Sequence, residues 1–224
     1  MNSPLPEIVW LLRHAETTAP HVFNGHESDV LLSTFGEAQA DAIAEWFVSF
    51  RPTAVVSSAM TRAIQTANPI AARCGVPSSI EPDLHERKIG AMAGTPFSHT
   101  DGPWFLTVKE WSGGNPAFST PGAESFEELN ARIVPVWDRV MAAHAGERVV
   151  VVAHGIVVKI LLLHLLEKGD PRAWGKIGRI QNVAVSGLRP TTDGWHAEPL
   201  LHVPENVARI AELFPSSLGI RSEG

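Results

Sequence analysis

Short, continuous apolar runs along the chain are typical of strands buried on both faces of a sheet. Ile8 to Leu12 and Arg148 to Ala153 are the clearest of these runs. Thr53 to Ser57 is a third, and Ser79 to Glu81 is a shorter candidate. These four segments are predicted to form the centre of one sheet.

Helical spacing follows the first and third of these predicted strands. Thr34 and Glu37 have the spacing of a capping box and predict a helix that reaches about Phe50. A second helix is predicted over Met60 to Arg73, interrupted near Pro69 because proline removes a helical hydrogen bond. Strands and helices therefore alternate in the first half of the chain.

The second half continues the alternation. Ser125 and Glu128 again have capping-box spacing, and apolar residues recur behind them at helical steps. This stripe consists of Phe126, Leu129, Ile133, Val136 and Val140. A further helix is predicted over Ile156 to Leu166, and an antiparallel pair over Val183 to Leu188 and His196 to Val203, joined through the turn TTDG.

Alternating strands and helices predict an α/β fold: a three-layer sandwich with a mostly parallel central sheet, helices on both faces and an antiparallel edge. No linker divides the chain, so residues 1–224 are predicted to form one domain. Residues 91–123, rich in Gly, Pro, Ser and Thr, predict an irregular cap over the site. Residues 215–224 are expected to be a flexible tail.

Composition narrows the classes of partner. The formal net charge of −6 argues against nucleic acid or an anionic membrane as a main partner. One cysteine, Cys74, excludes an internal disulfide framework, and its setting favours a small buried thiol over a nucleophile. The longest apolar stretch is broken by Lys159 and His164, and no signal peptide is recognised. A cytoplasmic location is therefore expected.

Phosphate-seeking side chains follow three of the predicted strands. The first strand runs into Arg13 and His14, and the run RVVVVA ends at His154 and Gly155, where a helix begins. Arg62 stands just after the strand TAVVS. Ligands of such sheets bind outside the carboxyl ends of the strands, and a helix N-terminus favours an anion. Each residue alone would be read as a core or solvated group, but their coincidence predicts an anion site.

Motifs along the chain carry a resemblance to a known family. In order, they are LLRHAET, FNGHESDVLLSTFGEAQA, SSAMTRAIQTA, LHERKIGAMAG, PGAESFEELNARI, VVVAHG and QNVAVSGL. Together they resemble the motifs of the histidine phosphatase superfamily, which includes the cofactor-dependent phosphoglycerate mutases, and the chain looks most like its phosphatase branch. The resemblance covers roughly residues 8–190.

The resemblance implies a role for each strand-end residue. His14 would be the nucleophile and form a phosphohistidine. The phosphoryl oxygens would be bound by Arg13, Arg62 and His154. Glu86 would protonate the leaving group and then help to activate water. This chemistry needs a neutral imidazole, fixed cationic donors and a positioned acid, and it needs neither a metal nor another cofactor.

Other positions are assigned with less support from the motifs. Asn24 and Gly155 are predicted to contact the phosphate, and Asn182 is a weaker candidate for a backbone contact. Glu81 is the alternative to Glu86 as the acid, because only the letters LHER favour the latter. Ala15 stands where the family usually has glycine, which adds one methyl group beside the nucleophile.

The expected reaction is hydrolysis of a small phosphorylated metabolite. A phosphoglycerate mutase would need additional cations in the cap to hold a carboxylate. Residues 91–123 contain one basic side chain, Lys109, and five large aromatic ones. These are Phe97, Trp104, Phe105, Trp111 and Phe118. Mutase-type transfer and a catalytically silent phosphate-binding protein are the alternatives, and the latter would not need both a nucleophile and an acid.

Overall fold

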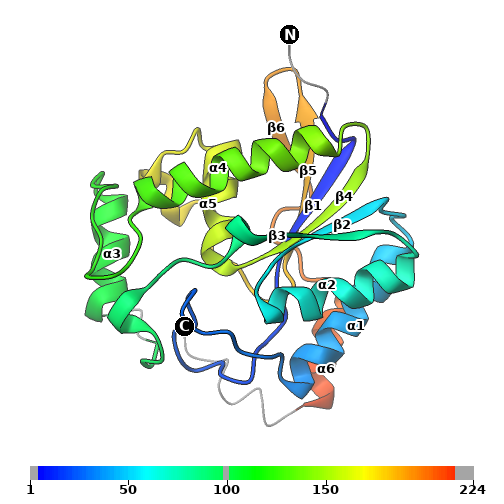
Figure 1. Ribbon diagram of the computed structural model, residues 1–224, viewed down its shortest axis with the longest axis horizontal. Coiled ribbons are helices and arrows are strands. Elements are labelled where there is room, and N and C mark those ends of the chain that lie inside the picture. Colours follow the sequence, from blue (N-terminus) through cyan, green and yellow to red (C-terminus); the bar gives the residue numbers. More distant parts are fainter. Residues whose placement is uncertain (1–4, 98–100, 215–224) are drawn as a thin grey trace.

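The computed structural model describes residues 5–97 and 101–214, and one mixed sheet organises them (Figure 1). Its strands are β1 (Ile8–Arg13), β2 (Ala54–Ser58), β3 (Ser78–Glu81), β4 (Arg148–Ala153), β5 (Val185–Thr191) and β6 (Gly194–Ala197). They lie in the order β3-β2-β4-β1-β5-β6, with β3, β2, β4 and β1 parallel and β5 and β6 antiparallel. The predicted α/β class with an antiparallel edge is confirmed.

Helices cover both faces of this sheet. The helices are α1 (Thr34–Val48), α2 (Thr61–Cys74), α3 (Gly102–Ser112), α4 (Phe126–Ala143), α5 (Gly155–Leu166) and α6 (Glu205–Leu213). One core cluster joins the sheet to α4 and α5, and the other joins it to α1 and α2. Figure 1 shows α3 beside one end of α4 and away from the sheet. None of the described helices has the length and apolar character needed to span a membrane.

Strand β1 supplies side chains to both clusters, which explains its uninterrupted apolar run. Val9 and Leu11 belong to the cluster beneath α4 and α5, while Trp10 and Leu12 belong to the cluster beneath α1 and α2. Successive side chains of a strand point to opposite faces, so a strand between two helical layers has no solvated side. The polar residues at its end therefore mark the end of the buried layer.

Two predicted features of the helices change in the structure, and a third is confirmed. The hydroxyl that caps α1 belongs to Ser33 and accepts from the backbone N–H of Gly36, so the predicted box at Thr34 is wrong by one residue. Helix α2 continues through Pro69, because its buried face against the sheet outweighs one lost backbone hydrogen bond. At α4 the capping box of Ser125 and Glu128 is confirmed.

Three further differences concern α3, β6 and α6. Helix α3 lies inside the cap that was predicted to be irregular, and it begins at Gly102 with a proline in its first turn. Strand β6 ends at Ala197 rather than Val203. Helix α6 was not predicted, and it packs against α1. The predicted flexible tail, residues 215–224, lies outside the described residues.

The parallel strands place their carboxyl ends at one edge. Arg13 pairs with Ala153 in the register of β1 and β4, and Ser57 pairs with Val152 in that of β2 and β4. The residues that follow these strands therefore meet at the same edge of the sheet. His14 and His154 are two of them, and their ring centroids lie 5.2 Å apart.

Candidate active site

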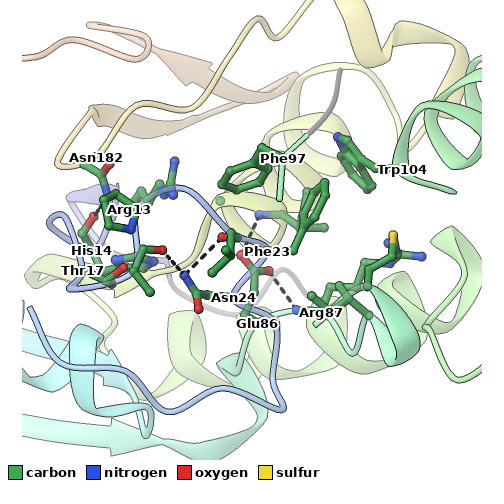
Figure 2. A pocket seen from close by; sticks show the side chains of 18 of the residues that line it. Arg13, His14, Thr17, Phe23, Asn24, Glu86, Arg87, Phe97, Trp104 and Asn182 are labelled. Atoms are coloured by element: carbon green, nitrogen blue, oxygen red, sulfur yellow. Dashed lines mark hydrogen bonds between the residues drawn. The ribbon is translucent and has the colours of Figure 1, made fainter. Parts of the chain in front are cut away.

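A cavity opens at this edge of the sheet (Figure 2). Arg13 and His14 lie at one end of it, and Phe23, Phe97 and Trp104 line the other. The carboxylate of Glu86 lies between the two ends (Figure 2). The further lining residues are Glu16, Thr17, Ala19, Pro20, Val22, Asn24, Gly25, Arg87, Ile89, Met92, Gly155, Ile156 and Asn182.

The imidazole of His14 is held in one orientation and one tautomer. Its Nδ1 lies 2.7 Å from the carbonyl oxygen of Ala15, which can only accept, so Nδ1 carries the proton. Burial, followed by the positive charges of Arg62 and Arg13, holds the pKa of His14 well below its ordinary value. The ring is therefore neutral at pH 7, and its Nε2 bears an unprotonated lone pair.

Backbone contacts fix the position of the residue as well as its ring. The N–H of His14 donates to the carbonyl of Ala153 at 2.9 Å, and the side chain of Asn182 donates to the carbonyl of His14, also at 2.9 Å. Asn182 thus contacts the backbone of the predicted nucleophile.

The loop after His14 is braced by side chains from two helices. The N–H of Ala15 donates to the hydroxyl of Thr66, and the N–H of Glu16 donates to the side-chain oxygen of Gln39. Helix α1 begins so close to this loop that a β-carbon at position 36 would lie 1.9 Å from the carbonyl oxygen of Glu16. Gly36 is therefore required by the packing, and the motif residues Gln39 and Thr66 act on the loop rather than on a ligand.

Hydrogen bonding holds the ring of His154. The hydroxyl of Ser58 accepts from the N–H of Met60 and lies 2.8 Å from Nε2 of His154. The other ring nitrogen, Nδ1, is buried without a hydrogen-bond partner. Burial, followed by the charge of Arg62, lowers the pKa of His154 well below its ordinary value.

The two predicted phosphate-binding arginines are partly engaged with backbone carbonyls. Arg13 donates to Ile180, and Arg62 donates to Ser28 and Gly25. The Nε atom of each guanidinium is buried without a hydrogen-bond partner. Burial lowers the pKa of Arg13 to about 10, and the negative charge of Glu86 limits that fall. Both side chains remain cationic at pH 7 and leave donors unused.

Of the two candidate acids, the geometry favours Glu86. One carboxylate oxygen accepts from the N–H of Arg87 at 2.8 Å, and the other accepts from the N–H of Ile156 at 3.2 Å. The second of these donors belongs to the first turn of α5, so the helix N-terminus orients the acid. Glu81 forms an ion pair with Arg139 and does not line the cavity.

Two further predicted phosphate contacts, Asn24 and Gly155, both line the cavity, and their contact with phosphate stays a prediction. The amide nitrogen of Asn24 donates to the carbonyls of Ala19 and Val22, so both of its hydrogens close its own loop. A β-carbon at Gly155 would lie 3.6 Å from Arg13 Nε, which is an ordinary contact, so packing alone does not require this glycine. Arg62 and His154 are fully buried and lie outside the cavity lining, whereas Arg13 and His14 border it directly.

Sequence reasoning missed Arg87 and Thr17, which both line the cavity. Arg87 is fully buried, and its guanidinium lies 5.6 Å from the ring centre of Trp104 and 5.0 Å from that of Trp111. No role was predicted for this arginine, although it stands next to the predicted acid in the sequence. The observation that marks this residue is its proximity to Trp104 and Trp111, and such a tertiary contact cannot be read from a sequence.

The aromatic residues of the cap differ in whether they line the cavity, lie buried or are exposed. Phe97 and Trp104 line the cavity, whereas Trp111 is fully buried and donates its indole N–H to the carbonyl of Phe118. Phe105 and Lys109 are exposed and do not line the cavity. Within the described ranges, no group of three or more metal-ligating side chains is present.

Comparisons with known proteins identify the family. The model of the histidine phosphatase superfamily (branch 1) matches residues 9–200, so the chain belongs to that superfamily, as its motifs predicted. A metal-independent phosphoserine phosphatase from Arabidopsis thaliana is 34% identical over 207 residues, covering 87% of this chain and 81% of that protein. Phosphoglycerate mutase-like protein 4 from the same plant is 35% identical over 188 residues, covering 82% and 79%.

Solved structures agree with this assignment. The native structure of a mycobacterial glucosyl-3-phosphoglycerate phosphatase superposes with a TM-score of 0.74 at 25% identity, covering 88% of this chain and 99% of that one. The prediction that the protein is a histidine phosphatase is confirmed at the level of the superfamily and its phosphatase relatives.

Proposed function

We propose that the protein hydrolyses phosphate monoesters of small metabolites through a phosphohistidine on Nε2 of His14. The observation that carries this proposal is the state of His14: it is neutral, its proton is held on Nδ1 by Ala15, and it borders the cavity. A neutral imidazole nitrogen at a cavity wall is a competent nucleophile toward phosphorus.

In the first step, Nε2 of His14 attacks phosphorus and the bond to the ester oxygen breaks. Arg13, Arg62 and His154 lie near His14, and Nε of each arginine and Nδ1 of His154 have no hydrogen-bond partner. These three side chains would bind the phosphoryl oxygens. Glu86, protonated at the start of the cycle, gives its proton to the departing ester oxygen.

In the second step, water attacks the phosphohistidine. Glu86, now a carboxylate, takes the proton from that water, and the bond between phosphorus and His14 breaks. Inorganic phosphate leaves, the lone pair returns to Nε2, and Glu86 is again protonated. The proton on Nδ1 remains on its carbonyl acceptor throughout.

Hydrolysis is favoured over mutase-type transfer by the position of the cations. Lys109, the one lysine or arginine of residues 91–123, is exposed and outside the cavity lining. A mutase holds a carboxylate-bearing, bisphosphorylated intermediate between half-reactions and needs additional cations for it. The phosphoserine phosphatase relative is consistent with this choice, although another relative is named as mutase-like.

Rapid quenching with a ³²P-labelled ester tests the proposal. Acid-labile, base-stable label is expected on the wild-type protein and should be absent from the His14→Asn variant. Label that survives in the variant would contradict the assignment of His14. A second assay supplies 3-phosphoglycerate with a trace of 2,3-bisphosphoglycerate. Interconversion of the 2- and 3-isomers faster than phosphate release would favour the mutase alternative.

A further inference from the structure

The half of the cavity that would receive the leaving group is apolar, and it suggests the class of substrate. We propose that the enzyme selects esters whose leaving group is an uncharged alcohol with an apolar or aromatic body, so that phosphate is the only anionic group of the substrate. This inference rests on the proposed function and adds the specificity of the same site.

Aromatic side chains form one wall of this half. Phe23 lies between Phe97 and Trp104, with ring centroids 4.4 Å from the former and 6.4 Å from the latter, and both pairs are edge-to-face (Figure 2). Edge-to-face packing fixes the rings relative to one another and leaves ring faces available for contact. The wall is therefore ordered before any ligand binds.

Further apolar side chains contribute to the cavity. They come from Val22, Ile89, Met92 and Ile156, which all line it. Apolar lining with a few fixed polar groups is the usual composition of a pocket that binds an apolar ligand body. Here the fixed polar groups are concentrated at the phosphate end.

The two arginines of the described lining have different surroundings. Among the described lining residues the arginines are Arg13 and Arg87. Arg13 lies beside His14, at the phosphate end. The Arg87 side chain runs away from Glu86 and toward the cap (Figure 2), where its Nε donates to the carbonyl of Glu124. Its guanidinium lies close to the rings of Trp104 and Trp111, which stabilise a cation that makes no hydrogen bond through its two terminal nitrogens.

Arg179 is a further cation close to the phosphate end. It lies near enough to Arg13 to contribute to lowering the pKa of that group. It is exposed and does not line the cavity. A carboxylate on the leaving group, within the apolar half, would therefore lie against aromatic rings and not against this side chain.

An acidic residue of the lining also disfavours a second anion. Glu16 contributes to the wall. A substrate carboxylate would lose its hydration in the apolar half and would be repelled by the negative charge of Glu16. Phosphoserine and phosphoglycerates carry such a carboxylate, so this enzyme is expected to hydrolyse them less efficiently than neutral aromatic esters.

A matched pair of esters tests the inference with the wild-type protein. 4-Methylbenzyl phosphate and 4-carboxybenzyl phosphate have similar leaving oxygens and shapes but differ in one negative charge. The value of kcat/KM is expected to be at least about tenfold higher for the methyl compound. Calorimetric titration with the two corresponding benzylphosphonates, which cannot be hydrolysed, should show the same order of affinity.

A pair of variants sharpens the test. Phe97→Lys places a cation at the cavity wall and is expected to raise kcat/KM for the carboxylated ester, relative to the methyl ester, by about fivefold. Phe105→Lys makes the same change on an exposed residue of the cap that does not line the cavity, and it should leave this ratio unchanged. Comparison of the two separates a local contact from a general change in net charge.

The outcomes distinguish the inference from the function on which it rests. Equal kcat/KM values and equal phosphonate affinities, or a preference for the carboxylated compounds, would overturn the inference and leave phosphatase activity intact. If neither ester is hydrolysed, the proposed function fails. The inference then stands or falls with the phosphonate affinities, which do not depend on turnover.

Discussion

The two ends of the cavity are built in different ways. At the phosphate end, His14 and its neighbours are fixed by hydrogen bonds from β4, α1, α2 and the segment before β5. At the leaving-group end, the wall consists of ring contacts between the loop that holds Phe23 and the cap. Directional bonds hold one end and apolar contacts hold the other.

This difference separates chemistry from selectivity. A nucleophile that must meet phosphorus in line needs its atoms held within a fraction of an ångström, which directional bonds provide. An apolar wall discriminates weakly between similar shapes, so it can change its substrates without disturbing the nucleophile. Substitutions at the phosphate end should therefore affect kcat and folding, and those at the cap should affect the choice of substrate.

Glu86 lies at the border of the two ends, and its loss should have the largest effect. Glu86→Gln keeps the shape but removes the proton, so turnover of an alkyl phosphate should fall by about 10²–10⁴-fold. A nitrophenyl phosphate, whose leaving group needs no proton, should slow much less. Steady-state kinetics with both esters measures the difference. Equal slowing would assign the acid role to another carboxylate.

Gly36 tests whether close packing holds the phosphate end. A β-carbon at this position would meet the carbonyl of Glu16 at 1.9 Å, so Gly36→Ala must displace the loop after His14. We expect a loss of roughly 3 kcal/mol in the free energy of unfolding, measured by urea denaturation. Gly175→Ala is the matched control, because a β-carbon there meets nothing within 4 Å. Similar losses in both variants would contradict the argument.

Thr66 tests a single brace of the same loop. Its hydroxyl accepts from Ala15 and donates to the carbonyl of Arg62, so Thr66→Val leaves a buried N–H unpaired and should cost about 1–3 kcal/mol. Thr107 is equally buried, but its hydroxyl only donates, to the carbonyl of Pro103. Thr107→Val is therefore expected to cost less. Urea denaturation of both variants measures the contribution of the Ala15 contact.

The sequence predicted the phosphate end better than the cap for a physical reason. Strand ends can be located from apolar runs, and parallel strands bring their carboxyl ends together whatever the loops do. Arg13, His14 and His154 could therefore be placed at one edge before any contact was known. Their tautomers could not, because these depend on Ala15 and Ser58 at distances that only the fold defines.

The cap was harder to predict because its order comes from tertiary contacts. Helix α3 starts in a segment rich in glycine and proline, and its stability depends on the burial of Thr107 and Trp111. Arg87 was missed for the same reason, because a guanidinium beside two tryptophans cannot be recognised without knowing that the cap packs there. Asn24 shows the converse: its residue type suits phosphate, but the loop uses its donors.

The smallest expected effect concerns protonation at the phosphate end. Burial and the charges of Arg62 and Arg13 hold the folded-state pKa of His14 below the ordinary value of 6.5, and His154 is shifted in the same direction. In the unfolded chain both imidazoles bind protons near pH 6.5, so the unfolded state takes up more protons as the pH falls. The free energy of unfolding should therefore decrease below pH 6.5, until the folded-state pKa values are passed.

Spectra of the free protein labelled with ¹⁵N-histidine check this directly. At pH 6.0 an ordinary imidazole is about three-quarters protonated, whereas the His14 and His154 signals should remain those of the neutral ring, with the proton of His14 on Nδ1. His14→Asn and His154→Asn variants assign the signals. A titration midpoint at or above 6.5 for either residue would show that neither burial nor the arginine charges disfavour the protonated ring at this end. Such a result would contradict the picture of a rigid, neutral nucleophile site beside an apolar cap.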